Sequence, residues 1–385
     1  MRRILYLSRG GLTAGSQRQL SHLLAGLDSR RYEPIVVCRE DGPFVESLKA
    51  DGVRTHVLTL HPWRKWTARL LRFADCRRLG RLARQADPAL VHCSDLWLAG
   101  YLRHVAGMLG VPSVLHVRAP KSPRELRKHG CHRVSATIAI SGRVQGKLLE
   151  AGVPAERISV IHDAVDLQQF RPRGEQANVL RREFPQAQGV LIGLVGRITP
   201  GKRQADFLHA AQQAIRIGGG QATFFIIGPV HSPQYAACLR SLAEQDGLAG
   251  RVVFTGQRAD MPEVLASLDA LVTLSGGSVM IEAMACGTPV VSAGFTPAGQ
   301  SMIVRDGQTG LLLPPGREDE LPEVLLRVIA EPELRRRFGQ AGRRHAETVF
   351  GTEALVAATL RLYDWLLDGD GRCEQVPLHG LPAEH

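Results

Sequence analysis

The sequence has no long apolar run and no closely spaced cysteines. No apolar run approaches the roughly 18 residues of a membrane-spanning helix, and the N-terminal run Ile4–Leu7 is too short for a signal peptide. The seven cysteines are scattered without a Cys-x-x-Cys pair, which disfavours a zinc site and a disulfide framework. We therefore expect a cytoplasmic protein without structural metal.

Lysine is also scarce: six lysines accompany 42 arginines. Such a skew often reflects the base composition of a gene, so the location of the charge is more informative than the total of +11. Residues 1–170 hold 27 basic and 14 acidic residues, whereas residues 171–385 hold 21 and 23. The basic half suggests a polyanion or an anionic membrane surface as partner. Neither an aromatic RNA-stacking signature nor a helix-turn-helix accompanies this charge, so we predict no nucleic-acid partner.

The 385 residues alternate short β-type runs with helical patterns, which predicts parallel sheets covered on both faces. The alternation stops at Asp166–Gln188, which we interpret as a linker, and then restarts. The fold class predicted is α/β, with two Rossmann-like, doubly wound domains facing across a cleft. The predicted division is residues 1–168, residues 169–350, a C-terminal helix over 351–368 packing back toward the first domain, and a mobile tail over 369–385.

The first informative motif is Gly196-Arg197-Ile198-Thr199-Pro200-Gly201-Lys202, between a predicted strand and a predicted helix. Arg197 and Lys202 are then expected at the carboxyl end of the strand, where two cations near a helix N-terminus suit a diphosphate. The alternative is a loop with two solvated charges.

The second motif runs from Ser275 to Val291 and contains Gly276-Gly277-Ser278-Val279 and Glu-Ala-Met-Ala-Cys-Gly-Thr-Pro from Glu282. The glycines allow a ligand to approach the backbone, and Ser278 is a candidate N-cap. Glu282, one turn into the helix, is suited to accept hydrogen bonds from the hydroxyls of a ribose. The alternative is a structural ion pair.

Together these motifs resemble the retaining glycosyltransferases of family 4, the group 1 family with the GT-B fold. The resemblance covers about residues 3–350 and includes Phe254-Thr255-Gly256 and Asp306-Gly307-x-Thr309-Gly310. It implies that Arg197 and Lys202 are catalytic, binding the donor diphosphate and stabilising its charge as it leaves.

The resemblance also implies further site residues. The predicted donor-binding residues besides Arg197 and Lys202 are Gly15, Gly277, Ser278, Val279 and Glu282. The resemblance also predicts His116 or Arg118 near the donor sugar. Lys121 is predicted near the acceptor for a different reason, because it belongs to a basic cluster from Arg118 to Lys128 that follows a predicted strand.

Three departures from the family pattern concern the sugar end of the site. The first glutamate of the usual pair is replaced by Leu274, a nearby acid by Met302, and an interdomain Asn-Gly by His162-Asp163-Ala164. The nucleotide end is intact. We find no Asp-x-Asp in a loop suited to a divalent cation, so we predict no cofactor and no metal, with cations supplying the electrostatic stabilisation.

Residues Trp63–Gln85 carry eight basic residues and one acid, and Trp66, Leu70 and Phe73 share one helical face. Aromatic anchors with flanking arginines indicate a helix on a membrane surface. The predicted membrane-facing residues are Trp63, Arg64, Lys65, Trp66 and Arg69. The alternative is an amphipathic helix packed on the sheet.

We therefore expect a metal-independent hexosyltransferase that is peripheral on the inner face of the cytoplasmic membrane. It would move a sugar from a nucleotide-diphosphate donor to a lipid-linked or polyanionic envelope glycan, as in lipopolysaccharide, exopolysaccharide or glycolipid synthesis. The missing first glutamate keeps a catalytically weak or silent sugar-nucleotide-binding protein as the alternative.

Overall fold

The computed structural model describes residues 1–11, 15–63, 69–218, 220–293, 303–314 and 316–369. The chain forms two compact units. The first contains Met1–Ala164 and the chain from Thr352 onward, and the second contains Val165–Gly351. The division thus falls at Ala164/Val165, slightly before the predicted 168/169. The predicted tail lies outside the described residues from residue 370 on.

The first unit is a seven-stranded parallel sheet in the order β3-β2-β1-β4-β5-β6-β7. Its strands are β1 (Arg2–Gly10), β2 (Tyr32–Glu40), β3 (Arg54–Val57), β4 (Leu90–Cys93), β5 (Ser113–Val117), β6 (Ala136–Ala139) and β7 (Ile158–Val160). Near-continuous apolar runs produce these strands, because a parallel sheet is buried on both faces.

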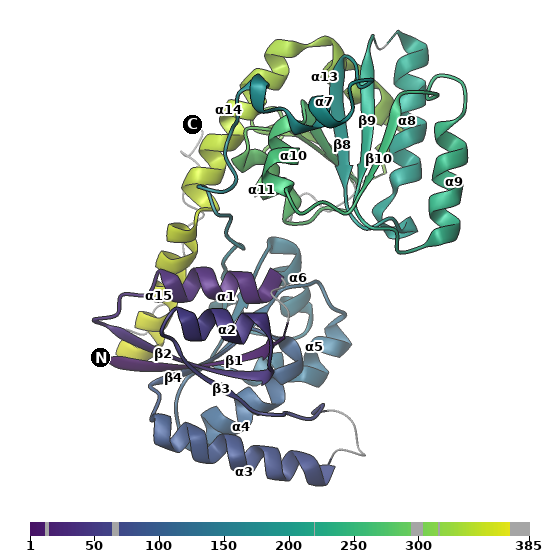
Figure 1. The fold of residues 1–385 in the computed structure, drawn as a ribbon. Helices are drawn as coiled ribbons and strands as arrows, with labels where there is room; N and C mark the ends of the chain where they lie inside the picture. The colour runs from purple at the N-terminus through teal and green to yellow at the C-terminus, as the bar shows by residue number, and fades with distance from the viewer. Residues whose placement is uncertain (12–14, 64–68, 219, 294–302, 315, 370–385) are drawn as a thin grey trace. The chain divides into compact units, whose positions relative to one another are not determined.

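Helices cover both faces of this sheet (Figure 1). One face packs against α1 (Gly15–Ala25), α2 (Pro43–Ala50) and α15 (Thr352–Asp368). The other packs against α3 (Arg69–Ala86), α4 (Ala99–Leu109), α5 (Pro123–His129) and α6 (Gly142–Glu150). The strand order reverses beside β1, because β2 and β3 lie on one side of it and β4 on the other. Doubly wound sheets bind ligands at the carboxyl ends of the strands at such a reversal.

The C-terminal helix α15 belongs to the first unit through a buried polar contact. The Tyr363 hydroxyl is fully buried, lies 2.5 Å from His92 Nδ1 and donates to the Tyr6 hydroxyl at 3.2 Å. Gly26 permits the close approach of α15, since a Cβ there would lie 2.4 Å from Val356. The helix is therefore anchored by its own side chains to the sheet of the first unit.

The second unit is a six-stranded parallel sheet in the order β10-β9-β8-β11-β12-β13. Its strands are β8 (Val190–Val195), β9 (Ala222–Ile227), β10 (Val252–Gly256), β11 (Ala270–Thr273), β12 (Val290–Ala293) and β13 (Gly310–Leu313). One face packs against α8 (Gln204–Ile217), α9 (Pro233–Ala243) and α13 (Leu321–Ala330). The other packs against α7 (Val179–Glu183), α10 (Met261–Ser267) and α11 (Val279–Ala285). Helix α14 (Pro332–Val349) contributes to both cores, with Leu334 and Phe338 on the first face and Ala346 on the other. Here the order reverses between β8 and β11.

The interpretation of Asp166–Gln188 as a linker is wrong, because this stretch is part of the second unit. Its helix α7 buries Leu180 completely, and the Asn178 side chain donates to the Ser267 carbonyl at 3.0 Å. The Val165 N–H donates to the Phe350 carbonyl at 2.8 Å. The charged residues that follow Leu180 in α7 are exposed, and the buried apolar residues of the segment, Phe170, Leu180 and Ala187, belong to the core.

Candidate functional site

Two predicted cations, Arg197 and Lys202, lie at the carboxyl end of β8. The short 3-10 turn Pro200–Lys202 separates the strand from α8, and the Gln204 side chain holds the Arg197 carbonyl at 3.0 Å. The Lys202 stem lies along Gly196, where a Cβ would come within 3.1 Å of it. Among the described residues, neither cation forms an ion pair.

Lys202 is half-buried, and Arg197 is exposed. Desolvation, followed by the nearby Arg197 guanidinium, lowers the pKa of Lys202 below its ordinary value. Two like charges held together without an acid raise the free energy of the empty site. An anion placed between them would relieve this repulsion.

The loop after β11 supplies the second half of the candidate donor site. Gly276 and Gly277 have φ values of 68° and 131°, which only glycine adopts without strain. A Cβ on Gly277 would meet no atom within 4 Å, so open space lies beside its backbone. Ser278 occupies the N-cap position of α11, but it has helical φ and ψ and its side chain makes no capping bond. The prediction of a side-chain cap is therefore wrong.

Glu282 lies in the first turn of α11, where its neighbours Ile281 and Ala283 are buried and Glu282 itself is half-buried. Burial, followed by the nearby Glu282 carboxylate, raises the pKa of the Cys286 thiol to about 12.

The strand order brings the two loops together. Strands β8 and β11 are parallel neighbours, with Leu194 in register with Val272. Their carboxyl ends therefore meet at the same edge, at the reversal of the second sheet. Arg197, Lys202 and the Gly276–Gly277 loop follow these two strands. This edge of the second unit is the candidate donor site.

The sugar-end departures have structural consequences. Leu274 is 3% exposed and belongs to the apolar core beside β8 and β11, so the position of the missing glutamate is filled by packing. Asp163 is ion-paired with Arg118. Met302 lies outside the described residues.

Of the residues predicted near the acceptor or donor sugar, two are engaged inside the first unit. His116, on β5, is buried and stacks on His92 with ring centroids 6.0 Å apart. Burial, then Arg118 and His92, lowers the pKa of His116 well below its ordinary value, which keeps the ring neutral. Arg118 lies 3.2 Å from His116 Nδ1. Both side chains thus belong to one buried network.

The remaining predicted residues of the first unit differ in placement. Gly15 is the first residue of α1. Lys121 pairs with Glu125 at 3.5 Å and lies 5.9 Å from the Trp97 ring.

Only part of the predicted membrane-facing set is described. Arg64, Lys65 and Trp66 lie outside the described residues, and Arg69 begins α3. The prediction that Trp63 faces a membrane is wrong. Its ring packs edge-on against Tyr101 at 5.0 Å and lies over Gly100, where a Cβ would come within 2.1 Å. The small residue on α4 creates the space that draws this ring inward.

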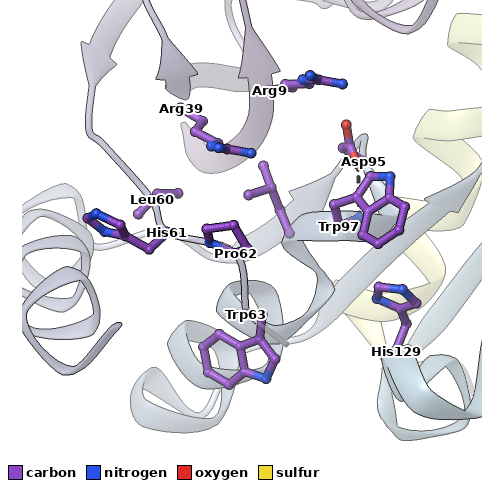
Figure 2. Close-up of a pocket in the computed structure, with 10 residues that line it drawn as sticks. Arg9, Arg39, Leu60, His61, Pro62, Trp63, Asp95, Trp97 and His129 are labelled. Carbon is purple, nitrogen blue, oxygen red and sulfur yellow. Dashed lines mark hydrogen bonds between the residues drawn. The ribbon is translucent and has the colours of Figure 1, made fainter. Parts of the chain in front are cut away.

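Sequence reasoning missed a pocket in the first unit (Figure 2). It has a volume of about 380 Å³ and is lined by Arg9, Arg39, Leu60, His61, Pro62, Trp63, Asp95, Trp97, Leu98 and His129. Arg9 and Arg39 are near the carboxyl ends of the neighbouring strands β1 and β2, and Asp95 follows β4. The sequence signal that could have indicated this pocket is an arginine near the carboxyl end of each of two adjacent strands.

In the described part of the chain, no group of three or more His, Cys, Asp or Glu side chains is arranged to hold a metal ion. In the same part of the chain, every helix is too short or too polar to cross a membrane.

Comparisons with known proteins match both units. A model of the group 1 glycosyl transferases matches residues 179–345, and a model of Glycosyltransferase Family 4 matches residues 13–169. The α-maltose-1-phosphate synthase of Mycolicibacterium smegmatis is 28% identical over 317 residues, or 73% of this chain and 80% of that protein. The GDP-mannose-dependent α-mannosyltransferase of Mycobacterium tuberculosis is 28% identical over 356 residues, or 86% and 87%.

A solved structure has the same fold. HepE of Anabaena, in complex with UDP, matches with a TM-score of 0.79 at 24% identity, over 95% of this chain and all of that one. The predicted two-domain α/β fold of the GT-B class is confirmed by the two parallel sheets and by this likeness.

Proposed function

The chain belongs to the group 1 glycosyltransferases of family 4, and we propose that its second unit holds a nucleotide-diphosphate sugar for transfer with retention of configuration. The observation that carries the proposal is the pair Arg197 and Lys202, which lacks an ion-pair partner among the described residues and lies at the strand-order reversal. The complex of HepE with UDP and the names of the sequence relatives support nucleotide-sugar chemistry.

In the proposed mechanism, each residue acts on charge or position. The Arg197 guanidinium donates two hydrogen bonds to the diphosphate, and the Lys202 ammonium acts as a point charge. The attraction between Lys202 and the leaving group becomes stronger as negative charge develops on that group. The backbone beside Gly277 leaves room for a phosphate or the donor sugar, and Glu282 accepts the ribose hydroxyls. Because two cations neutralise the leaving diphosphate, we propose hexosyl transfer without a divalent metal.

For the acceptor we propose a lipid-linked or polyanionic glycan of the cell envelope, reached from the cytoplasmic face of the membrane. The α3 patch, defined as Leu70, Leu71 and Phe73 with the flanking arginines of α3, supports this. Leu70 is 86% exposed and Phe73 is 64% exposed, so these residues do not pack on the sheet. Exposed apolar side chains flanked by arginines are typical of helices that bind anionic membrane surfaces.

The exposed charged side chains of α3 are all basic. The single acid of the segment, Asp75, is buried and receives hydrogen bonds from the His61 N–H at 2.8 Å and the Tyr101 hydroxyl at 2.9 Å. Arg77, Arg81 and Arg84 remain exposed. An anionic bilayer therefore meets no exposed carboxylate along this helix.

The membrane proposal is tested by co-sedimentation with phosphatidylglycerol and phosphatidylcholine vesicles. We expect binding to the anionic vesicles that weakens with salt, and its loss in Leu70→Ser/Phe73→Ser. Leu149→Ser removes a leucine that is 45% exposed on α6 and is the matched control. Absence of binding at low salt, or equal binding by the double variant, would overturn the membrane proposal.

The donor proposal is tested by a thermal-shift panel of UDP-, GDP-, ADP- and CMP-sugars. A ligand at 100 times its dissociation constant adds about 2.7 kcal/mol of stability. We expect one nucleotide class to stabilise the wild type, and Arg197→Ala or Glu282→Gln to abolish that shift. Arg216→Gln, an exposed charge removal at the far end of α8, should retain it. If no nucleotide sugar stabilises the wild type, the donor assignment is wrong.

A second candidate function, a sugar-nucleotide-binding protein without transfer activity, is favoured by one observation. Leu274 fills the place of the first family glutamate with an apolar, buried side chain. Release of nucleoside diphosphate separates the two functions, because a binding protein would be stabilised by the donor without consuming it.

A further inference from the structure

We infer that the pocket of the first unit binds an anionic sugar, one that carries a carboxylate or a phosphate, with Trp97 as the platform and Arg9 and Arg39 as the anion-binding groups. The pocket lies at the strand-order reversal of the first sheet, between the ends of β1 and β4 (Figure 2). The volume of about 380 Å³ falls within the range of small-molecule sites. Naming the occupant as the acceptor rests on the proposed function, whereas the binding chemistry does not.

The apolar part of the pocket provides a flat surface for a sugar ring. Trp97 is 53% exposed, which is unusual for a tryptophan, and its ring is held edge-on by the buried His129 at 5.1 Å. Leu98 and Leu60 are buried at the base. An exposed, positioned aromatic ring beside apolar side chains suits the C–H face of a pyranose.

The short turn that carries Trp97 is capped by Asp95. The Asp95 carboxylate accepts a hydrogen bond from the backbone N–H of Trp97 at 2.9 Å, at the start of the 3-10 turn Leu96–Leu98. Asp95 is one of the residues that line the pocket (Figure 2), and its second carboxylate oxygen can accept a hydrogen bond from a sugar hydroxyl. The pocket thus combines an aromatic surface with a hydroxyl acceptor.

The two arginines give the pocket its charge preference. Arg9 and Arg39 each approach the same carboxylate, Glu40, only to 3.8 Å. This distance exceeds that of a hydrogen bond, so the Glu40 contacts leave the guanidinium donors available. Of the residues that line the pocket, Arg9 and Arg39 are cationic and Asp95 is anionic, so the lining itself carries a net positive charge. A carboxylate or phosphate on a sugar stacked against Trp97 would complete the hydrogen bonding of both arginines.

The test compares four probes: glucose, glucuronic acid, glucose 6-phosphate and inorganic phosphate. The three sugars share one ring and differ at carbon 6, so their affinities, measured by calorimetry at low salt, isolate the effect of the anion. We expect at least one charged sugar to bind about 10-fold more tightly than glucose, and the preferred anion identifies the carboxylate or phosphate class. Inorganic phosphate should bind more weakly than that sugar, because it has no ring to stack.

Variants assign the contributions. Arg9→Gln and Arg39→Gln should each weaken the binding of the charged sugar about 10-fold and leave the binding of glucose nearly unchanged. Trp97→Ala should weaken the binding of all three sugars, whereas Trp97→Phe should retain it. Arg30→Gln removes an exposed arginine of the same unit outside the pocket and should change nothing.

Equal affinities for glucose and both charged sugars, or undetectable binding of all sugars, would overturn the inference. Phosphate binding as tight as glucose 6-phosphate, or arginine variants that bind like the wild type, would also overturn it. Failure of the nucleotide-sugar panel on the wild type, with charged sugars still binding, would instead remove the transferase proposal and leave this pocket in place.

Discussion

Replacing Lys202 by methionine tests the proposed electrostatic role of the donor site. Methionine keeps the unbranched stem that lies along Gly196 and removes the ammonium. At an effective dielectric constant near 20, a charge about 4 Å from the diphosphate contributes on the order of 4 kcal/mol, and the partial exposure of Lys202 reduces this figure. Deleting one donor to a developing oxyanion costs about 3 kcal/mol, which is about 100-fold in rate. We expect kcat/KM for nucleoside diphosphate release to fall by about 100-fold.

The same variant separates an electrostatic role from a structural one. Because burial and Arg197 lower the pKa of Lys202, its charged form is destabilised in the empty site. We therefore expect the Tm of Lys202→Met to match or exceed that of the wild type. Lys202→Arg should restore part of the activity and extend it to higher pH, since activity requires the protonated form, which lysine loses first. If Lys202→Met lowers the activity by less than about 3-fold, the reasoning is refuted, because 3-fold corresponds to only about 0.7 kcal/mol. Arg216→Gln, which removes a positive charge elsewhere on the same unit, is the control.

Three further predictions concern stability and the altered sugar end. Hydrogen bonds from His61 and Tyr101 outweigh burial and hold the pKa of Asp75 below its ordinary value. The stabilisation that Asp75 contributes is therefore present above the ordinary carboxyl pKa and is lost as the pH falls through the pKa of Asp75 in the folded protein. Asp75→Asn should lower the free energy of unfolding by about 3 kcal/mol at neutral pH, measured by urea titration. Tyr363→Phe removes the partner of buried His92 and should cost about 1–3 kcal/mol, and an unchanged urea midpoint would contradict the anchoring of α15. Leu274→Glu would bury a carboxylate in the core, so we expect loss of folded protein rather than gain of transfer activity; a stable, more active variant would show that the site accepts the missing acid.

The sequence was most informative where one pattern decided the local structure. The motif that begins at Gly196 and ends at Lys202 was predicted between a strand and a helix, and it lies between β8 and α8. By contrast, α7 is only five residues long, and packing of Leu180 rather than helical periodicity determines it. Short helices of this kind have little intrinsic stability, so local patterns do not reveal them.

The candidate sites differ in the same way. The donor-site cations lie within one contiguous motif, so they could be named from the sequence. The pocket of the first unit joins Arg9, Arg39 and Trp97 from three segments, and only the strand order β2-β1-β4 brings them together. Trp63 was misassigned because its chain neighbours are basic, whereas Gly100, 37 residues later, provides the space that it fills.

The central claim is donor-dependent glycosyl transfer with retention, and the anomer of the first released sugar tests it most directly. The α-linked nucleotide sugar selected by the thermal-shift panel is incubated with the protein, and proton NMR follows the reaction before mutarotation. We predict release of nucleoside diphosphate with the α-anomer appearing first, and loss of both signals in Arg197→Ala/Lys202→Ala. A donor that binds without being consumed, or a β-anomer that appears first, would contradict the account.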